Sequence, residues 1–164
     1  MNTFWANRNP IVANLFNPAF CGEVIRVAAN GFTSQSNNDF PFAFSFLILP
    51  ILLHKETRDS MPRTTRSYLF AWVEENDGLF YDFGKRTQGM VRFTREALSF
   101  SLMYRRIYIT ENGCIKANAS KMKLRGKDGY EEYDEILRKA DMLGKWLGKT
   151  NDVKSIYSFF RITP

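Results

Sequence analysis

The longest uncharged stretch of the chain runs from Phe40 to Leu53 and is apolar at nearly every position. It is too short to cross a bilayer, which takes about 20 apolar residues in a row. We therefore expect it to be buried, either inside the protein's own core or against a partner. Its length favours a helix that is kinked at Pro50 or ends near Leu49. A buried strand is the alternative, because periodicity does not separate the two in so uniformly apolar a segment.

Helical patterns precede this stretch. Pro10 suits the first position of a short helix, where its missing N–H costs nothing. Asn17 and Pro18 supply a cap and a first position for a second helix, which we expect to reach about Asn30. One face of that helix would carry Phe20, Val24, Val27 and Ala28.

Helical spacing returns after the stretch. At its end, His54 is expected to bond a free carbonyl or to favour the helix dipole. Residues 69–73 and 79–104 follow a helical pattern, and the second range places Phe93, Ala97, Phe100 and Tyr104 on one face. A long helix is predicted after Asp128 and a short one after Asn151 or Asp152. Their buried faces would carry Tyr133, Ile136, Leu137, Ala140, Leu143 and Leu147, then Val153, Ile156, Tyr157 and Phe160.

Between these helices the pattern alternates with a period of two, which predicts a β-hairpin at residues 106–118. A two-residue turn at Asn112-Gly113 would place Ile109 opposite Lys116. A three-residue loop instead places Ile109 opposite Ile115 and gathers the apolar side chains on one face. It also gives Gly113 a left-handed conformation that glycine adopts at little cost. We therefore predict the three-residue loop.

Together these elements predict an α+β fold that is mostly helical, with a short β-hairpin in a winged-helix-like arrangement. The 164 residues contain no repeat or linker, so residues 1–164 are treated as a single domain.

Aromatic residues are abundant, with 15 Phe, 7 Tyr and 3 Trp. This is more than one small core obviously needs, and large aromatic side chains dominate protein interfaces. We therefore expect part of the surplus to form a partner interface, with Trp5, Phe20, Phe159 and Phe160 as its candidate residues.

The formal net charge of +6 permits an anionic partner. The basic residues are spread along the chain, however, and a solvated loop explains the densest group better than phosphate contact does. A winged helix that docks on DNA would nevertheless place charges around its hairpin. The candidate nucleic-acid contacts are Arg105, Arg106, Lys116, Lys121, Lys123, Arg125 and Lys127.

Catalytic chemistry finds little support in the sequence. Cys21, His54 and Asp59 are the only combination that could form a nucleophile–base–acid set, and each has a simpler structural role. Neither a metal-ligand pattern nor a phosphate-binding glycine loop is present. We therefore expect a protein that is not an enzyme and needs no metal or cofactor. With no signal peptide recognisable at the N-terminus, we expect a cytoplasmic location without membrane contact.

Several sequence blocks resemble the middle component proteins of ABC three-component systems. The specific blocks are NPAFCG at 17–22 and LPILLHK at 49–55, the latter followed by Thr57-Arg58. Residues 5–8, 15–16, 41–42, 47–48, 93–98 and 156–164 are also similar. The ending Phe160-Arg161-Ile162 departs from the family, in which a step like Leu-Gly-Val is expected.

The resemblance implies a non-enzymatic adaptor in a bacterial anti-phage or anti-plasmid defence complex of the Lamassu type. Its partners would be an SMC/Rad50-like ABC ATPase and an effector subunit of the nuclease type, with DNA reached through the complex. The alternative is a winged-helix protein that binds DNA on its own.

Overall fold

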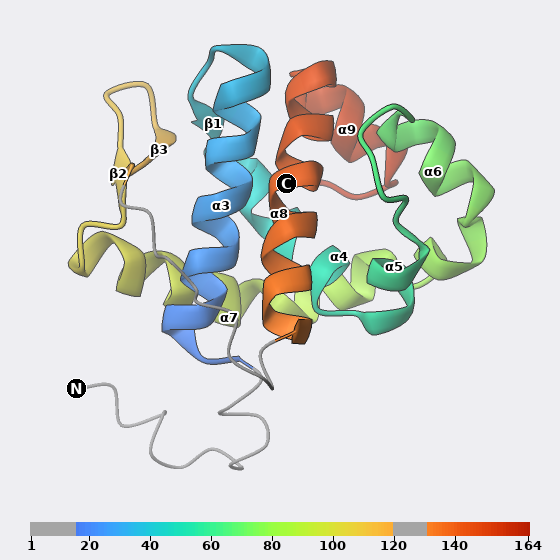
Figure 1. Ribbon diagram of the computed structural model, residues 1–164, viewed down its shortest axis with the longest axis horizontal. Coiled ribbons are helices and arrows are strands. Elements are labelled where there is room, and N and C mark those ends of the chain that lie inside the picture. Colours follow the sequence, from blue (N-terminus) through green and yellow to red (C-terminus); the bar gives the residue numbers. More distant parts are fainter. Residues whose placement is uncertain (1–15, 120–130) are drawn as a thin grey trace.

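The computed structural model describes residues 16–119 and 131–164 (Figure 1). These residues form mainly helices with one small antiparallel sheet, which confirms the mostly helical α+β prediction. In chain order the elements are α3 (Pro18–Ser36), β1 (Phe40–Pro41), the 3-10 helix η1 (Phe42–Phe44), α4 (Ser45–Leu52), α5 (Lys55–Ser60), α6 (Leu69–Glu75), the 3-10 helix η2 (Asp77–Phe80), α7 (Phe83–Met103), β2 (Ile107–Ile109), β3 (Cys114–Ala117), α8 (Glu131–Thr150) and α9 (Val153–Phe159). The predicted helix after Pro10 and the predicted start of α8 at Asp128 lie outside the described residues.

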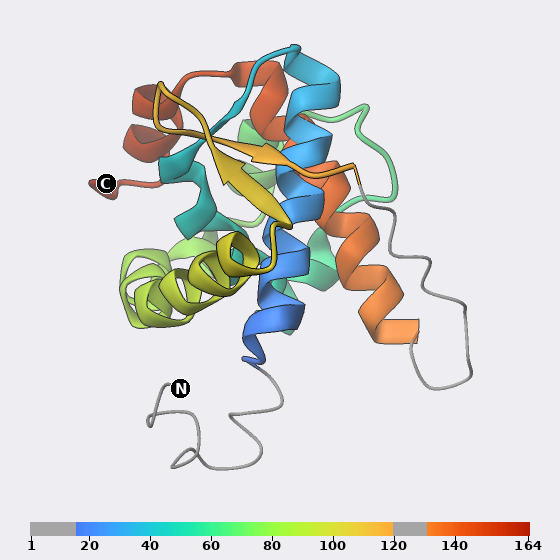
Figure 2. The same ribbon diagram turned by 90° about the vertical axis from the view of Figure 1, so that its left-hand side faces the viewer.

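Helices α3 and α8 run side by side in the same direction and form the centre of the fold (Figures 1 and 2). Their backbones come unusually close because small residues line the seam between them. A Cβ atom built on Gly144 would collide with the carbonyl oxygen of Ala28, and one on Gly148 would lie 2.9 Å from the carbonyl oxygen of Phe32. Glycine is therefore required at Gly144 by the space available, although the local backbone is ordinary helix.

The long apolar stretch becomes β1, η1 and α4, so the helix predicted for its centre is confirmed. Pro50 lies in the last turn of α4. This helix packs against α3, α7 and α8. The fully buried apolar side chains of the stretch are Phe40, Phe44, Leu47, Ile48, Leu49, Ile51 and Leu52. The protein's own core therefore covers most of this segment, although Phe42 stays 41% exposed.

The sheet has the order β1-β3-β2. In the β2–β3 pair Ile107 lies opposite Ala117 and Ile109 opposite Ile115, and the N–H of Thr110 donates to the carbonyl of Cys114 at 2.8 Å. Gly113 has a φ of 73°. The three-residue loop and its left-handed glycine are thus confirmed. The third strand was not predicted; in it Phe40 pairs with Ile115. Whether the hairpin acts as a wing stays a prediction.

Two expectations about side chains were wrong. His54 does not serve the end of α4; it is the N-cap of α5, and its Nδ1 accepts a hydrogen bond from the N–H of Thr57 at 3.3 Å. A new helix begins directly after His54, so its ring meets free N–H groups rather than free carbonyls. Tyr104, expected on one helix face with Phe93, Ala97 and Phe100, instead follows the end of α7 at Met103 and is 60% exposed.

Candidate partner interface

A buried ion cluster joins the hairpin to α3. Both oxygens of Glu23 accept hydrogen bonds from the guanidinium of Arg26, at 2.9 and 2.7 Å, and Oε2 also accepts one from Nη2 of Arg106 at 3.0 Å. Nη1 of Arg26 donates to the carbonyl of Asn118 at the other end of the hairpin, at 2.9 Å. Two residues one turn apart on α3 therefore hold both ends of the hairpin.

The charge state of Glu23 follows from this geometry. Burial by itself would raise the pKa of the carboxyl, since only 5% of the residue is exposed. Hydrogen bonds from Arg26 and Arg106 outweigh burial and hold the pKa below its ordinary value. The carboxylate is therefore ionised at neutral pH and keeps both guanidinium groups paired.

The hairpin and the end of α7 carry exposed apolar side chains, which we call the 102–109 surface. Met103 and Tyr104 are the most exposed, at 76% and 60%, while Tyr108 and Ile109 on β2 are 47% and 44% exposed. Leu102 completes the set at 39%. Single exposed apolar residues are ordinary, but five within eight consecutive positions suit this end of the molecule to protein contact, with the neighbouring Tyr108 and Ile109 on opposite faces of the sheet.

A groove of about 800 Å³ lies elsewhere, between α7 and the C-terminal residues. Its apolar lining includes Phe42, Phe46, Val91, Ile162 and Pro164. The hydroxyl of Tyr157 donates to the carbonyl of Ala43 at 2.5 Å and fixes α9 against η1 at one wall. Phe42, 41% exposed, is the one phenylalanine among the exposed large hydrophobic residues of the described chain.

Two arginines give this groove a positive character. Arg95 of α7 and Arg161 after α9 both line it and are exposed. Within residues 16–119 and 131–164 neither makes an ion pair or a side-chain hydrogen bond. The groove therefore offers an apolar lining with two cations that the described residues leave without a carboxylate, which suits an apolar segment that also carries carboxylates.

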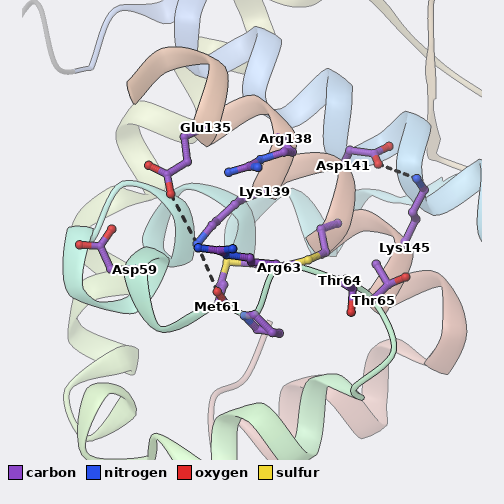
Figure 3. Close-up of a pocket in the computed structure, with 12 residues that line it drawn as sticks. Asp59, Met61, Arg63, Thr64, Thr65, Glu135, Arg138, Lys139, Asp141 and Lys145 are labelled. Atoms are coloured by element: carbon purple, nitrogen blue, oxygen red, sulfur yellow. Dashed lines mark hydrogen bonds and ion pairs between the residues drawn. The ribbon is translucent and has the colours of Figure 1, made fainter. Parts of the chain in front are cut away.

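A second cavity, of about 590 Å³, lies between α8 and the segment after α5 (Figure 3). Lys139 reaches across from α8 and donates to the carbonyls of Arg58 and Met61, at 2.7 and 3.2 Å. Burial lowers the pKa of its ammonium group, although the neighbouring Glu135 opposes the shift. The three carboxylates lining this cavity, Asp59, Glu135 and Asp141, are each paired with a lysine. We therefore interpret the side chains around this cavity as holding α8 against the segment that follows α5.

Comparison with known proteins assigns the chain. Its sequence matches the family described as ABC-three component system middle component 3 over residues 5–164. The chain belongs to this family. Neither a curated protein nor a solved structure matches it significantly.

The specific motif residues of this middle component serve helix ends. Asn17 caps α3 by accepting a hydrogen bond from the N–H of Ala19 at 2.8 Å, with Pro18 next at the first helical position. Arg58 is buried and donates to the carbonyl of Leu52 at the end of α4, at 2.8 Å. His54 and Arg58 thus hold the end of the apolar stretch beside α5, whereas Asn17 and Pro18 begin α3.

Three of the basic residues predicted to contact nucleic acid lie on or beside the hairpin of the middle component. Arg105 and Lys116 are exposed around the hairpin, whereas Arg106 is drawn into the ion cluster with Glu23. The remaining basic candidates, Lys121, Lys123, Arg125 and Lys127, lie outside the described residues.

The predicted aromatic interface residues make contacts within the chain. Phe20 packs on Tyr133, with ring centroids 4.8 Å apart, and Phe159 on Phe70 at 4.3 Å. Phe160 is buried and contacts Phe83 at 4.7 Å. Trp5 lies outside the described residues. The 102–109 surface was missed because its residues continue the apolar pattern of α7 and β2 and look like core in sequence.

The candidate catalytic residues are far from reactive in this middle component. Burial raises the pKa of the Cys21 thiol to about 12, which keeps it protonated and a poor nucleophile. His54 is occupied as a cap, and Asp59 pairs with Lys55 at 2.5 Å. Within the described residues there is no group of three or more potential metal ligands. No described helix is long and apolar enough to span a membrane.

Proposed function

We propose that this middle component is a non-enzymatic adaptor that joins an SMC/Rad50-like ABC ATPase to an effector subunit of the nuclease type. The complex would be a bacterial anti-phage or anti-plasmid defence system of the Lamassu type, and DNA would be reached through the ATPase. The family match over residues 5–164 carries this proposal, because a middle component is by description one part of a system with an ABC component.

The groove beside α7 supports the adaptor role. Its apolar lining and the guanidinium groups of Arg95 and Arg161, which no side chain in the described part of the chain pairs, give it the character of a binding site for an acidic, partly apolar segment. Internal roles found for Cys21, His54 and Asp59 support a protein that works by contact rather than by catalysis.

Co-expression with the ABC ATPase and effector encoded beside it tests the proposal. We expect a stable complex that survives size-exclusion chromatography, and we expect Arg95→Glu with Arg161→Glu to weaken it without lowering the melting temperature. Tyr81→Asp is the matched control, since Tyr81 is exposed but lies outside the groove. A middle component that elutes alone, with both other subunits folded and present, would contradict the adaptor role.

Direct DNA binding is the second candidate, favoured by the exposure of Arg105 and Lys116 beside the hairpin. It predicts duplex affinity that falls steeply with salt and that drops when both residues are changed to Ala. Affinity that is absent, or unchanged in the double variant, would remove this candidate.

A further inference from the structure

The end of helix α9 has a backbone conformation that its sequence does not favour. Arg161 has a φ of 55°, in the left-handed region that glycine adopts freely and that a side chain makes costly. The N–H groups of Arg161 and Ile162 donate to the carbonyls of Ser158 and Tyr157, at 3.0 and 3.1 Å. This is the Schellman arrangement of a helix end, in which the left-handed position is usually glycine. The side chain of Arg161 is therefore kept at a cost in stability, which a role outside the helix would explain.

Three other non-glycine residues of the described chain share this conformation. Asn37 and Asn151 are asparagines, which tolerate it because their short side chains can form local hydrogen bonds. Arg105 occupies the same position at the end of α7, with the same pattern of backbone hydrogen bonds. Because Arg105 lies outside the groove beside α7, it measures the cost of a left-handed arginine on its own.

The conformation of Arg161 places this residue at the groove. The tail that follows α9 packs on the first turn of α7, where Cγ2 of Ile162 lies 3.3 Å from the position of a Cβ on Gly84. Arg95 lines the same groove from further along α7. Among the described residues that line it, no side chain is acidic. A ligand therefore has to supply the carboxylates for both arginines.

The walls of the groove determine which kind of polypeptide segment fits. The described lining residues belong to η1, α4, α7, α9 and the tail, and none of them lies on a strand. The walls thus offer no sheet edge with which an extended segment could exchange backbone hydrogen bonds. A helix satisfies its own backbone groups and presents an apolar face to such a groove. Along α7 the lining runs from Gly84 to Arg95, which is about 16 Å or about three helical turns.

We propose that the groove binds an amphipathic helix of about three turns from a partner subunit, with Arg161 and Arg95 pairing acidic residues beside its apolar face. The inference rests on the adaptor function and adds the conformation and chemistry of the segment that is bound. Apolar residues of the partner helix, spaced three and four apart, pack on Phe42, Phe46 and Val91.

The exposed phenylalanine of the groove agrees with this occupant. Phe42 is 41% exposed and meets Phe46 edge to face, with ring centroids 5.8 Å apart. The apolar face of a helix covers both rings and removes Phe42 from water. Binding thus combines burial of an aromatic pair with two charge contacts at the margin of the groove.

Arg161→Gly separates a binding role from a structural one. The variant is compared with wild type as the free chain and in complex with the ABC ATPase and effector encoded beside it. Relief of the left-handed strain should raise the melting temperature of the free chain by about 1–4 °C. Loss of the charge contact should raise the dissociation constant of the complex about tenfold. Arg161→Lys keeps the charge and should weaken the complex less.

Two further variants serve as controls. Arg105→Gly relieves the same strain outside the groove and should raise the melting temperature by a similar amount. Lys154→Ala removes a positive charge from an exposed site on α9 outside the groove and should leave the dissociation constant within about twofold. A lower melting temperature for Arg161→Gly would overturn the proposal, because the arginine would then serve its own chain. Undiminished affinity of that variant would overturn it as well.

A photoreactive benzoylphenylalanine in place of Gln88, which is exposed on the α7 wall of the groove, identifies the bound segment. We expect it to cross-link to a partner segment that has apolar residues at helical spacing and flanking Asp or Glu. A cross-linked segment with alternating apolar residues, or without acidic residues, would overturn the proposal. An intact complex that gives no cross-link would also overturn it, while leaving the adaptor function in place. Absence of any complex with the wild-type chain would instead remove the adaptor function itself.

Discussion

Glu23 and Arg106 lie 83 positions apart in the sequence, yet Oε2 of Glu23 accepts a hydrogen bond from Nη2 of Arg106 at 3.0 Å. Arg26 completes the cluster from one turn further along α3. The hairpin is thereby anchored to the central helix through charge as well as through apolar packing.

Replacing Glu23 with Gln should destabilise the protein by about 3 kcal/mol, because two guanidinium groups lose their counter-charge while one stays buried. Chemical denaturation at pH 7 measures the loss. Asp59→Asn, which breaks the exposed pair with Lys55, is the control and should have a far smaller effect. Equal effects would show that the cluster contributes no more than a surface pair.

The same carboxyl makes stability depend on acidity. Its pKa is lowered in the folded state, so the unfolded chain binds a proton more readily. This contribution is complete above the ordinary value of 4.5 and is lost as the pH falls below it, toward the folded pKa. In the Glu23→Gln variant the free energy of unfolding should therefore fall less steeply as the pH is lowered below 4.5.

His54 should cause a separate decline at higher pH. Burial first, and then the nearby Arg86 guanidinium, lower its pKa from the ordinary 6.5. The neutral ring caps α5, so stability is complete above pH 6.5 and falls as the pH drops below it, until the folded pKa is passed. His54→Asn keeps a capping acceptor but does not titrate, and it should remove this decline from melting curves recorded between pH 7 and 5. An unchanged curve would assign the decline to other groups.

Gly144→Ala should destabilise the protein strongly, by about 2 kcal/mol or more, since the added methyl group forces α3 and α8 apart. Gly89→Ala provides a matched control on α7, where a Cβ meets nothing within 4 Å. That change should stabilise the protein by up to about 1 kcal/mol, because alanine favours helix. Similar melting temperatures for the two variants would contradict the tight seam.

Lys139→Met should cost about 1–3 kcal/mol, because the carbonyls of Arg58 and Met61 lose their shared donor while the apolar stem is kept. Arg138→Met, one position earlier and exposed, tests whether charge alone matters. The denaturant midpoint of Lys139→Met should be clearly lower than that of Arg138→Met. Equal midpoints would show that the hydrogen bonds of Lys139 to Arg58 and Met61 contribute little to stability.

Local signals predicted much of the fold. The register of β2 and β3 followed from placing Ile109 and Ile115 on one face, and the start of α3 followed from Asn17 and Pro18. Strand β1 could not be predicted, because it has two residues and forms only when β3 lies beside it. The dense apolar pattern of the stretch gave no sign of this pairing.

Long-range relationships were invisible in sequence. Glu23 and Arg26 have the spacing of an ordinary exposed helix pair, and nothing local indicates that Arg106 joins them. The need for glycine at Gly144 depends on Ala28, which lies on another helix. The 102–109 surface could not be found either, since exposure depends on where the body of the fold ends rather than on residue type.

The hydrogen bond between Tyr157 and Ala43 joins residues 114 positions apart and has a consequence for biosynthesis. The apolar stretch leaves the ribosome long before α8 and α9, the helices that help to enclose it and fix its start. At ordinary translation speeds the interval is on the order of ten seconds. Until α8 and α9 are made, only α3 and α7 can cover this apolar segment, and we expect a ribosome-associated chaperone to bind the part that they leave open.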